Sequence, residues 1–332
     1  MRTRTFGLLF LLLFAAASLS ARQTLPLADG WQFAYEADDW QSVTLPHTWN
    51  ADDGTTPGYR RGTGVYRRTL VLSRSDLRQR LFLRFEGVSM KARVTVNGRL
   101  VGTHAGPFTA FCFEITDAVH QGSNLVEVTV SNAPDDAIAP LEGDFTIFGG
   151  IYRPVTLLSL PATCITPLDY GSSGLYLSST LEGDDARLKA RVLVDTRSAR
   201  HRQRTPRVTV AVRDAQGRLV AESDAPLLAP SVTADSVRTY AAQLTVPSVH
   251  RWDGLADPYL YTVTATVRVG RRVLDAVSLP TGFRSVSVDG RRGFFLNGHP
   301  YKLHGVNRHQ DHAGKGWALT EDDHRQDMAI IR

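Results

Sequence analysis

Cysteine is scarce in this sequence, which has two, Cys112 and Cys164, among 332 residues. The pair forms no cysteine cluster of the kind that binds a metal ion. In an exported protein the two could form one disulfide. Cys112, however, lies between two phenylalanines, a setting typical of a buried strand. We therefore favour two free buried thiols, with the disulfide as the alternative.

Long apolar runs are also lacking, apart from one at residues 6–17. Two arginines precede this run, and the small residues Ser18 and Ser20 follow it. This order is typical of a cleaved secretory signal peptide. The run is too short to span a hydrocarbon core of about 30 Å. We expect cleavage near Ser20, a periplasmic or extracellular location, and no membrane contact afterwards.

A strong excess of charge is absent, because the formal net charge is only +5. Removing residues 1–20 leaves 36 basic against 33 acidic residues, a net charge of +3. The densest basic stretch, residues 197–207, predicts a solvated loop or strand edge, with an anionic polysaccharide site as the alternative. An exported chain without a basic aromatic motif predicts no nucleic-acid partner.

Helical periodicity of useful length is missing between Trp31 and about Leu160. Short runs rich in β-branched and aromatic residues occur there instead, separated by polar residues or glycine. Asn97-Gly98 is a strong hairpin signal directly after one of them. Many short strands with regularly spaced turns predict a sandwich or jelly roll. The predicted strands include residues 65–72, 80–85, 92–96 and 124–130.

A second set of strands follows a predicted linker between Pro161 and Pro167. Residues 214–217 supply a turn between two of these strands. About 115 residues of this kind suit a seven-stranded immunoglobulin-like sandwich, closed by residues 282–284. The predicted strands are residues 186–194, 207–212, 239–246 and 260–269.

The pattern changes again after residue 284. Asn297-Gly298 predicts a hairpin, residues 302–306 a short strand, and residues 307–312 a polar loop. Thr320 to Asp323 fit a capping box that starts a helix. A single strand–loop–helix unit cannot bury its own apolar faces. The side chains that we expect to lack partners are Leu303, Val306, Met328 and Ile331.

Three segments resemble glycoside hydrolase family 2. Residues 45–50 with 62–68 resemble the family's opening, residues 144–155 the end of its sugar-binding domain, and residues 295–309 the start of its catalytic (β/α)8 barrel. They occur in the family's order and cover the mature chain.

The resemblance implies a mostly β fold that follows a signal peptide at residues 1–20. Residues 21–162 are expected to form a jelly-roll sugar-binding domain, and residues 163–283 an immunoglobulin-like β-sandwich. Residues 284–332 are expected to form the first βα unit of an incomplete, truncated (β/α)8 or TIM barrel.

The resemblance also implies that this chain lacks the catalytic groups. Retaining glycosidases place two carboxyl groups about 5–5.5 Å apart, and this family uses two glutamates on later barrel strands, the acid/base following an asparagine. The sequence has no Asn-Glu dipeptide, and its last glutamate, Glu321, lies in the predicted helix. We therefore expect no catalytic residue and no turnover in the chain as given.

Five residues are candidates for substrate binding by resemblance. His309 is expected to contact sugar hydroxyls, with a purely structural histidine as the alternative. Asp144 is expected to reach into the sugar site, with a turn-capping aspartate as the alternative. Arg308 is expected to orient a catalytic carboxylate, while Asn307 and Asp311 shape the same loop.

We predict no catalytic metal and no required cofactor. His309, Asp311 and His312 have a spacing that could suggest ligands, but adjacent residues on a strand point to opposite faces. A Mg²⁺ or Na⁺ ion near the sugar site is allowed by the resemblance alone.

The substrate expected from the motifs is a β-galactoside, because residues 307–312 and 316–318 look closer to the β-galactosidase branch. Arg61 departs from that branch, where some members place an asparagine, and a cation there would favour an acidic sugar. A β-glucuronidase and a non-catalytic carbohydrate-binding protein therefore stay open as alternatives. A homo-oligomer is also open, since relatives use these β-domains for assembly.

Overall fold

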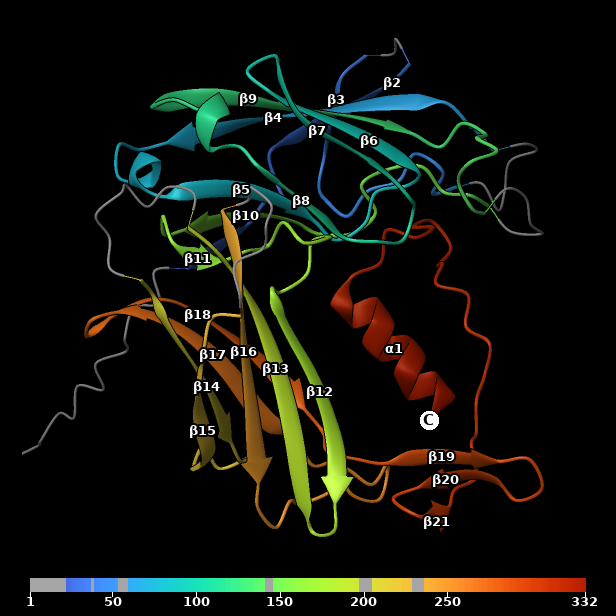
Figure 1. Cartoon of the computed structure of the whole chain (residues 1–332). Coiled ribbons are helices and arrows are strands. Elements are labelled where there is room, and N and C mark those ends of the chain that lie inside the picture. The colour runs from blue at the N-terminus through green and yellow to red at the C-terminus, as the bar shows by residue number, and fades with distance from the viewer. Residues whose placement is uncertain (1–21, 37–38, 53–58, 141–145, 197–204, 229–235) are drawn as a thin grey trace, which may run out of the picture.

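The computed structural model describes residues 22–36, 39–52, 59–140, 146–196, 205–228 and 236–332 (Figure 1). The expected signal peptide, the candidate Asp144 and most of the arginine-rich stretch lie outside the described residues. Within those ranges, no helix has both the length and the apolar character needed to cross a membrane.

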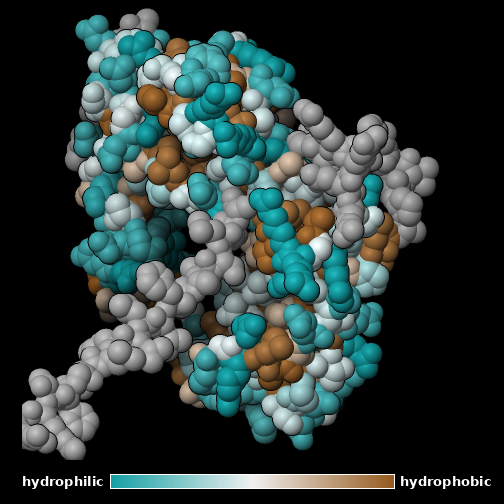
Figure 2. All heavy atoms as spheres, turned by 90° about the vertical axis from the view of Figure 1, so that its left-hand side faces the viewer, coloured by the Kyte–Doolittle hydropathy of each residue, from teal (hydrophilic) through white to brown (hydrophobic). Residues whose placement is uncertain are grey.

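Two antiparallel sheets form the first sandwich, the upper half of Figure 1 and of the side view in Figure 2. The six-stranded sheet has the order β3 (Gln41–Val43), β2 (Trp31–Tyr35), β4 (Thr63–Leu72), β9 (Gly122–Ser131), β6 (Lys91–Val96) and β7 (Arg99–Ala105). The four-stranded sheet has the order β1 (Gln23–Pro26), β10 (Val155–Leu160), β5 (Arg80–Phe85) and β8 (Phe111–Glu114). Short 3₁₀ turns at Asp76–Arg78 and Thr116–Ala118 flank β5 and β8.

Alternating burial explains why these residues form strands. Along β9 every second side chain from Asn124 to Val130 is buried, as expected for a strand with one face on a core. Trp31, Tyr66 and Phe85 contribute large rings to that core. Asn97 and Gly98 adopt φ angles of 52° and 77° between β6 and β7, which confirms the predicted hairpin.

The second sandwich also has two antiparallel sheets, which confirms the predicted immunoglobulin-like fold. In one, β13 (Asp185–Asp195) pairs with β11 (Cys164–Ile165) and β12 (Leu175–Glu182) on one edge and with β16 (Val237–Val246) on the other. The other sheet has the order β15 (Leu219–Ala225), β14 (Arg207–Arg213), β17 (Tyr261–Val269) and β18 (Arg272–Thr281). Phe283 is fully buried in the core between them.

The predicted linker between Pro161 and Pro167 is wrong in one respect, because it contains β11. Cys164 and Ile165 pair with the end of β13 and are buried, since the backbone there completes an existing strand edge.

The two cysteines are free and buried, as favoured from the sequence. They belong to one small apolar cluster with Phe82, Leu158 and Leu160. Burial raises the pKa of each thiol to about 12, so both stay protonated and unreactive at neutral pH.

Buried ion pairs join the two sandwiches. Arg80 on β5 binds Asp195 on β13 at 2.8 Å, and these side chains are 3% and 0% exposed. Glu114 on β8 holds the same guanidinium at 2.7 Å. Arg22, just before β1, binds Asp275 on β18 at 2.8 Å. The Arg80–Asp195 and Arg22–Asp275 pairs each tie the first sandwich to the second.

The remaining residues form a small sheet and one helix, at the right of Figure 1. The sheet has the order β19 (Val286–Asp289), β20 (Gly293–Leu296) and β21 (His299–Pro300). Helix α1 (Glu321–Ile331) begins after Thr320, and the predicted capping box with Asp323 is present. The chain forms no closed barrel among the described residues.

The strand predicted at residues 302–306 is wrong, because the structure has irregular backbone there. A barrel strand needs a hydrogen-bonded neighbour on each side, and no described strand offers one to this segment. The expectation of unpartnered apolar side chains is confirmed: Leu303, Val306 and Met328 are 65%, 64% and 50% exposed.

Candidate functional site

The predicted sugar-contact loop lies between β21 and α1. Asn307, His309 and Asp311 are exposed, and among the described residues their side chains make no hydrogen bond. The structure therefore places these three residues on one accessible loop without closing a site around them. Their roles toward sugar stay predictions.

Arg308 anchors this loop to helix α1. Its Nε donates to Oδ2 of Asp327 at 2.8 Å, and its Nη2 lies 3.0 Å from Nδ1 of His324. His312 holds the other carboxylate oxygen of Asp327 at 2.9 Å. Hydrogen bonds from Arg308 and then His312 lower the pKa of Asp327. No motif singled out this partner in the sequence, although Asp323 and Asp327 are four residues apart on one helix face.

Asp323 forms a second anchor beside the first. Lys315 Nζ donates to its Oδ1 at 2.6 Å, and Thr320 donates to its Oδ2 from the backbone at 2.7 Å. The Lys315 hydrogen bond, followed by those from Thr320, lowers the pKa of Asp323 below its usual range. Across the ranges that the structure describes, no three His, Cys, Asp or Glu side chains are grouped to hold a metal ion.

Trp317 docks the loop onto the first sandwich. Its ring is 8% exposed and lies 5.4, 5.3 and 5.3 Å from the rings of Phe108, Phe148 and Tyr152. Gly316 has a φ of +51°, and a Cβ there would lie 2.3 Å from the Phe148 ring. Only glycine permits this close approach. The first sandwich therefore positions the segment that carries the candidate His309.

Arg61 is engaged inside the first sandwich. Its Nε donates to the Asn132 carbonyl at 2.9 Å, and its Nη2 lies 3.7 Å from Sδ of Met90. The buried Asn132 side chain also accepts from Gly62 N–H at 2.9 Å and donates to the Ile147 carbonyl at 2.8 Å. Arg61 thus has a structural role, and this geometry adds no support for a contact with an acidic sugar.

His47 lines a cavity of about 320 Å³ where the first sandwich meets residues 314–320. Its Nδ1 lies 2.7 Å from the Tyr66 hydroxyl, and Phe33 packs against its ring. Burial lowers the pKa of His47 to about 4, so the neutral imidazole is the folded form.

Acidification should destabilise the protein through His47. Unfolding restores a pKa near 6.5, so the unfolded state binds the proton more tightly. The stabilisation is complete above pH 6.5 and is lost as the pH falls toward 4, by up to about 3 kcal/mol. Urea unfolding at pH 7 and pH 4.5 measures it. In His47→Gln this part of the pH dependence should disappear, whereas exposed His120→Gln should behave like the parent. Equal pH dependence in all three proteins would contradict the prediction.

Three family models match consecutive parts of the chain. They are the sugar binding domain of glycosyl hydrolases family 2 at residues 14–161, glycosyl hydrolases family 2 at residues 173–284, and the TIM barrel domain of the same family at residues 286–332.

Similar proteins include some named β-glucuronidase and some named β-galactosidase. A β-glucuronidase from Bacteroides fragilis is 39% identical over 98% of this chain and 47% of its own length. A β-galactosidase from Bacteroides ovatus is 28% identical over 92% of this chain and 36% of its own length. The crystal structure of a β-glucuronidase from Bacteroides uniformis matches with a TM-score of 0.85 and 35% identity, over 93% of this chain and 38% of that one. The chain thus spans less than half the length of these relatives.

Proposed function

Because the chain belongs to glycosyl hydrolases family 2, we propose that it is the substrate-gripping amino-terminal part of a retaining β-glycosidase. Two sandwiches and the first βα segment would hold one side of the sugar. The two catalytic glutamates would come from barrel strands that this sequence does not contain.

The substrate class that we propose first is the β-glucuronides, with β-galactosides second. The observation that supports this order is sequence identity. The chain is 39% identical to the Bacteroides fragilis β-glucuronidase and 28% identical to the Bacteroides ovatus β-galactosidase. This reverses the order that the motif at residues 307–312 suggested. That motif is the reason to keep β-galactosides as the second candidate. Arg61 does not separate the two, because its guanidinium binds Asn132.

The residues proposed to face the sugar are those of the docked loop. His309 is exposed, and a neutral imidazole can donate to one hydroxyl and accept from another. Asn307 and Asp311 would extend this polar surface, and Asp144 would reach it from the first sandwich. We further propose export through residues 1–20 to the periplasm or the outside of the cell.

The chain alone should give no turnover of 4-nitrophenyl β-glucuronide or β-galactoside above the buffer blank, because it lacks the two glutamates. A protein extended by a complete barrel should hydrolyse the β-glucuronide at least about 100-fold faster than the β-galactoside. Release of 4-nitrophenol measures both rates. Hydrolysis by the 332-residue chain would contradict the first expectation, and a preference for the β-galactoside would contradict the proposed substrate.

A further inference from the structure

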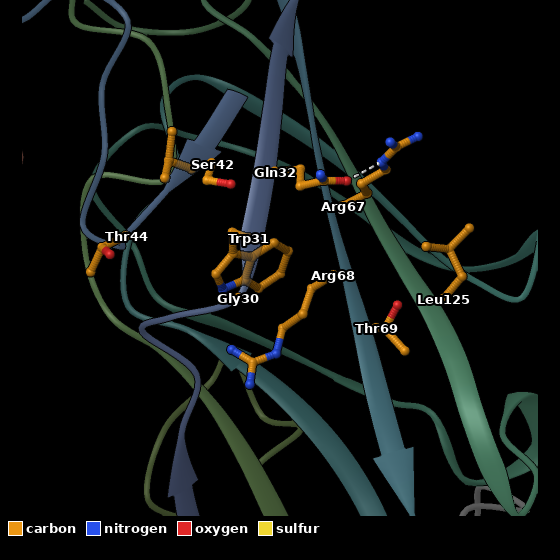
Figure 3. A pocket seen from close by; sticks show the side chains of 10 residues that line it. Gly30, Trp31, Gln32, Ser42, Thr44, Arg67, Arg68, Thr69 and Leu125 are labelled. Carbon is orange, nitrogen blue, oxygen red and sulfur yellow. Dashed lines mark hydrogen bonds between the residues drawn. The ribbon is translucent and has the colours of Figure 1, made fainter. Parts of the chain in front are cut away.

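The outer face of the six-stranded sheet carries a recess of about 510 Å³ near its β3 edge (Figure 3). Residues of four neighbouring strands or their ends line it, and the sheet order places them side by side. Gly30 lies among them with a φ of 78° and adds no side chain, which leaves the space open. The polar side chains of the lining are Gln32, Ser42, Thr44, Arg67, Arg68 and Thr69.

Arg67 is held rigidly at this recess. Its Nε donates to Oε1 of Gln32 at 2.9 Å, the bond drawn in Figure 3. Its Cζ lies 3.7 Å from the ring centroid of Trp40, a cation–π contact. Two contacts on two sides fix the plane of the guanidinium. The Arg67 side chain would therefore lose little conformational freedom when a ligand binds it.

No acidic side chain neutralises Arg67 within the described part of the chain. Glu127 lies opposite it in the register of β4 and β9, yet the two form no ion pair. The guanidinium turns instead toward β2 and Trp40, on the other side of β4. The terminal amino groups of Arg67 point away from Gln32 in Figure 3, and among the described residues only its Nε makes a hydrogen bond.

The neighbouring Arg68 adds positive charge on the core side of the same strand. It lies over Trp31 at 6.0 Å, and its buried Nε has no hydrogen-bond partner among the described residues. Its Nη1 donates to the Asp29 carbonyl, and the Asp29 carboxylate offsets the charge of Arg68. The positive charge offered to a ligand is therefore that of Arg67 at the rim.

These observations match the chemistry of an acidic sugar. A fixed guanidinium fork pairs with a carboxylate through two parallel hydrogen bonds. The hydroxyls of Ser42 and Thr69 can donate to and accept from sugar hydroxyls. The Thr44 hydroxyl donates to Asp29 at 3.0 Å and can accept. Leu125, at the β9 side, offers apolar surface to the carbon–hydrogen face of a sugar ring. The volume lies within the range of about 300–1,000 Å³ that small-molecule sites occupy.

We propose that this recess is a glycan-binding subsite that takes a uronic-acid residue of an acidic polysaccharide through Arg67. The site consists of first-sandwich residues only, so it requires neither the barrel nor the proposed hydrolysis. Its failure and the failure of the proposed function are therefore separate outcomes, one seen in binding and the other in turnover.

Isothermal titration calorimetry of the chain with trigalacturonate tests the proposal, with the neutral maltotriose as the control ligand. We expect trigalacturonate to bind, and Arg67→Gln to weaken it by about 10-fold or more, because a charge-assisted hydrogen-bond pair is lost. Arg74→Gln is the matched control, because Arg74 is exposed on the same sandwich and lies outside the recess. It should bind like the parent. Thermal unfolding of each variant verifies that the sandwich is intact.

Three results would overturn the subsite. One is unchanged affinity in Arg67→Gln, and another is an equal loss in Arg74→Gln, which would show charge attraction without a site. The third is maltotriose binding as tightly as trigalacturonate, which would show that the carboxylate is not recognised.

Discussion

Replacing Asp195 with asparagine should lower the free energy of unfolding by about 3 kcal/mol. Asp195 is fully buried and accepts hydrogen bonds from Arg80 at 2.8 Å and from the Ser236 hydroxyl at 2.8 Å. The asparagine leaves Arg80 buried with one carboxylate fewer, and breaking such a pair typically costs about 3–5 kcal/mol. We expect the lower end of that range, because Glu114 remains bound to Arg80.

Urea unfolding followed by circular dichroism measures this loss. The matched control is Asp224→Asn, which removes an exposed carboxylate of β15 from its pair with Arg207 on the neighbouring strand β14. An exposed pair contributes about 0–1 kcal/mol, so the control should unfold near the parent's midpoint. If both variants lose the same stability, the burial of the Arg80–Asp195 pair does not matter and the explanation fails. The pair matters for the structure because it joins β5 of one sandwich to β13 of the other.

Trp317→Ala should release residues 286–332 from the first sandwich. The substitution removes a buried ring from its contacts with Phe108, Phe148 and Tyr152. Truncating a buried tryptophan costs about 3–5 kcal/mol. One contact between this segment and the first sandwich that remains is the Arg153–Gln310 hydrogen bond at 3.2 Å. A loss of about 3 kcal/mol corresponds to roughly a 100-fold rise in the open form of this segment.

Limited proteolysis followed by mass spectrometry measures the release. Cleavage after residue 284 should accelerate by about 100-fold in the variant while both sandwiches stay intact, because proteolysis tracks the open population. Trp40→Ala is the control, since Trp40 is a partly exposed tryptophan of the first sandwich without a contact to this segment. Equal cleavage rates in the parent and Trp317→Ala would show that the tryptophan does not hold the segment.

The strands could be predicted because their signal is local. Alternating apolar residues in β4 and β9 must face one core, and Asn97-Gly98 and Asn297-Gly298 supply the positive φ angles that tight hairpins require. The capping box at Thr320 is equally local, since its two partners are three residues apart. The strand predicted at residues 302–306 failed for the opposite reason, because a strand exists only where a neighbour completes its hydrogen bonds.

The candidate site, too, could be predicted only where its signal is local. The loop with Asn307, His309 and Asp311 could be found from the sequence, and the structure leaves it accessible. What holds that loop could not be found, because Trp317 packs on rings more than 160 residues earlier in the chain, and Arg308 depends on the placement of Asp327.

The two β-sandwiches, the family and the start of helix α1 could be predicted from the sequence, since each rests on short local patterns. How the sandwiches join through Arg80 and Asp195, and how Trp317 docks the predicted sugar-contact loop, depends on the fold in three dimensions. The fold also places Arg67 beside Gln32 and Trp40 at the recess. These contacts unite residues that are distant along the chain, and no local pattern encodes a distance in space.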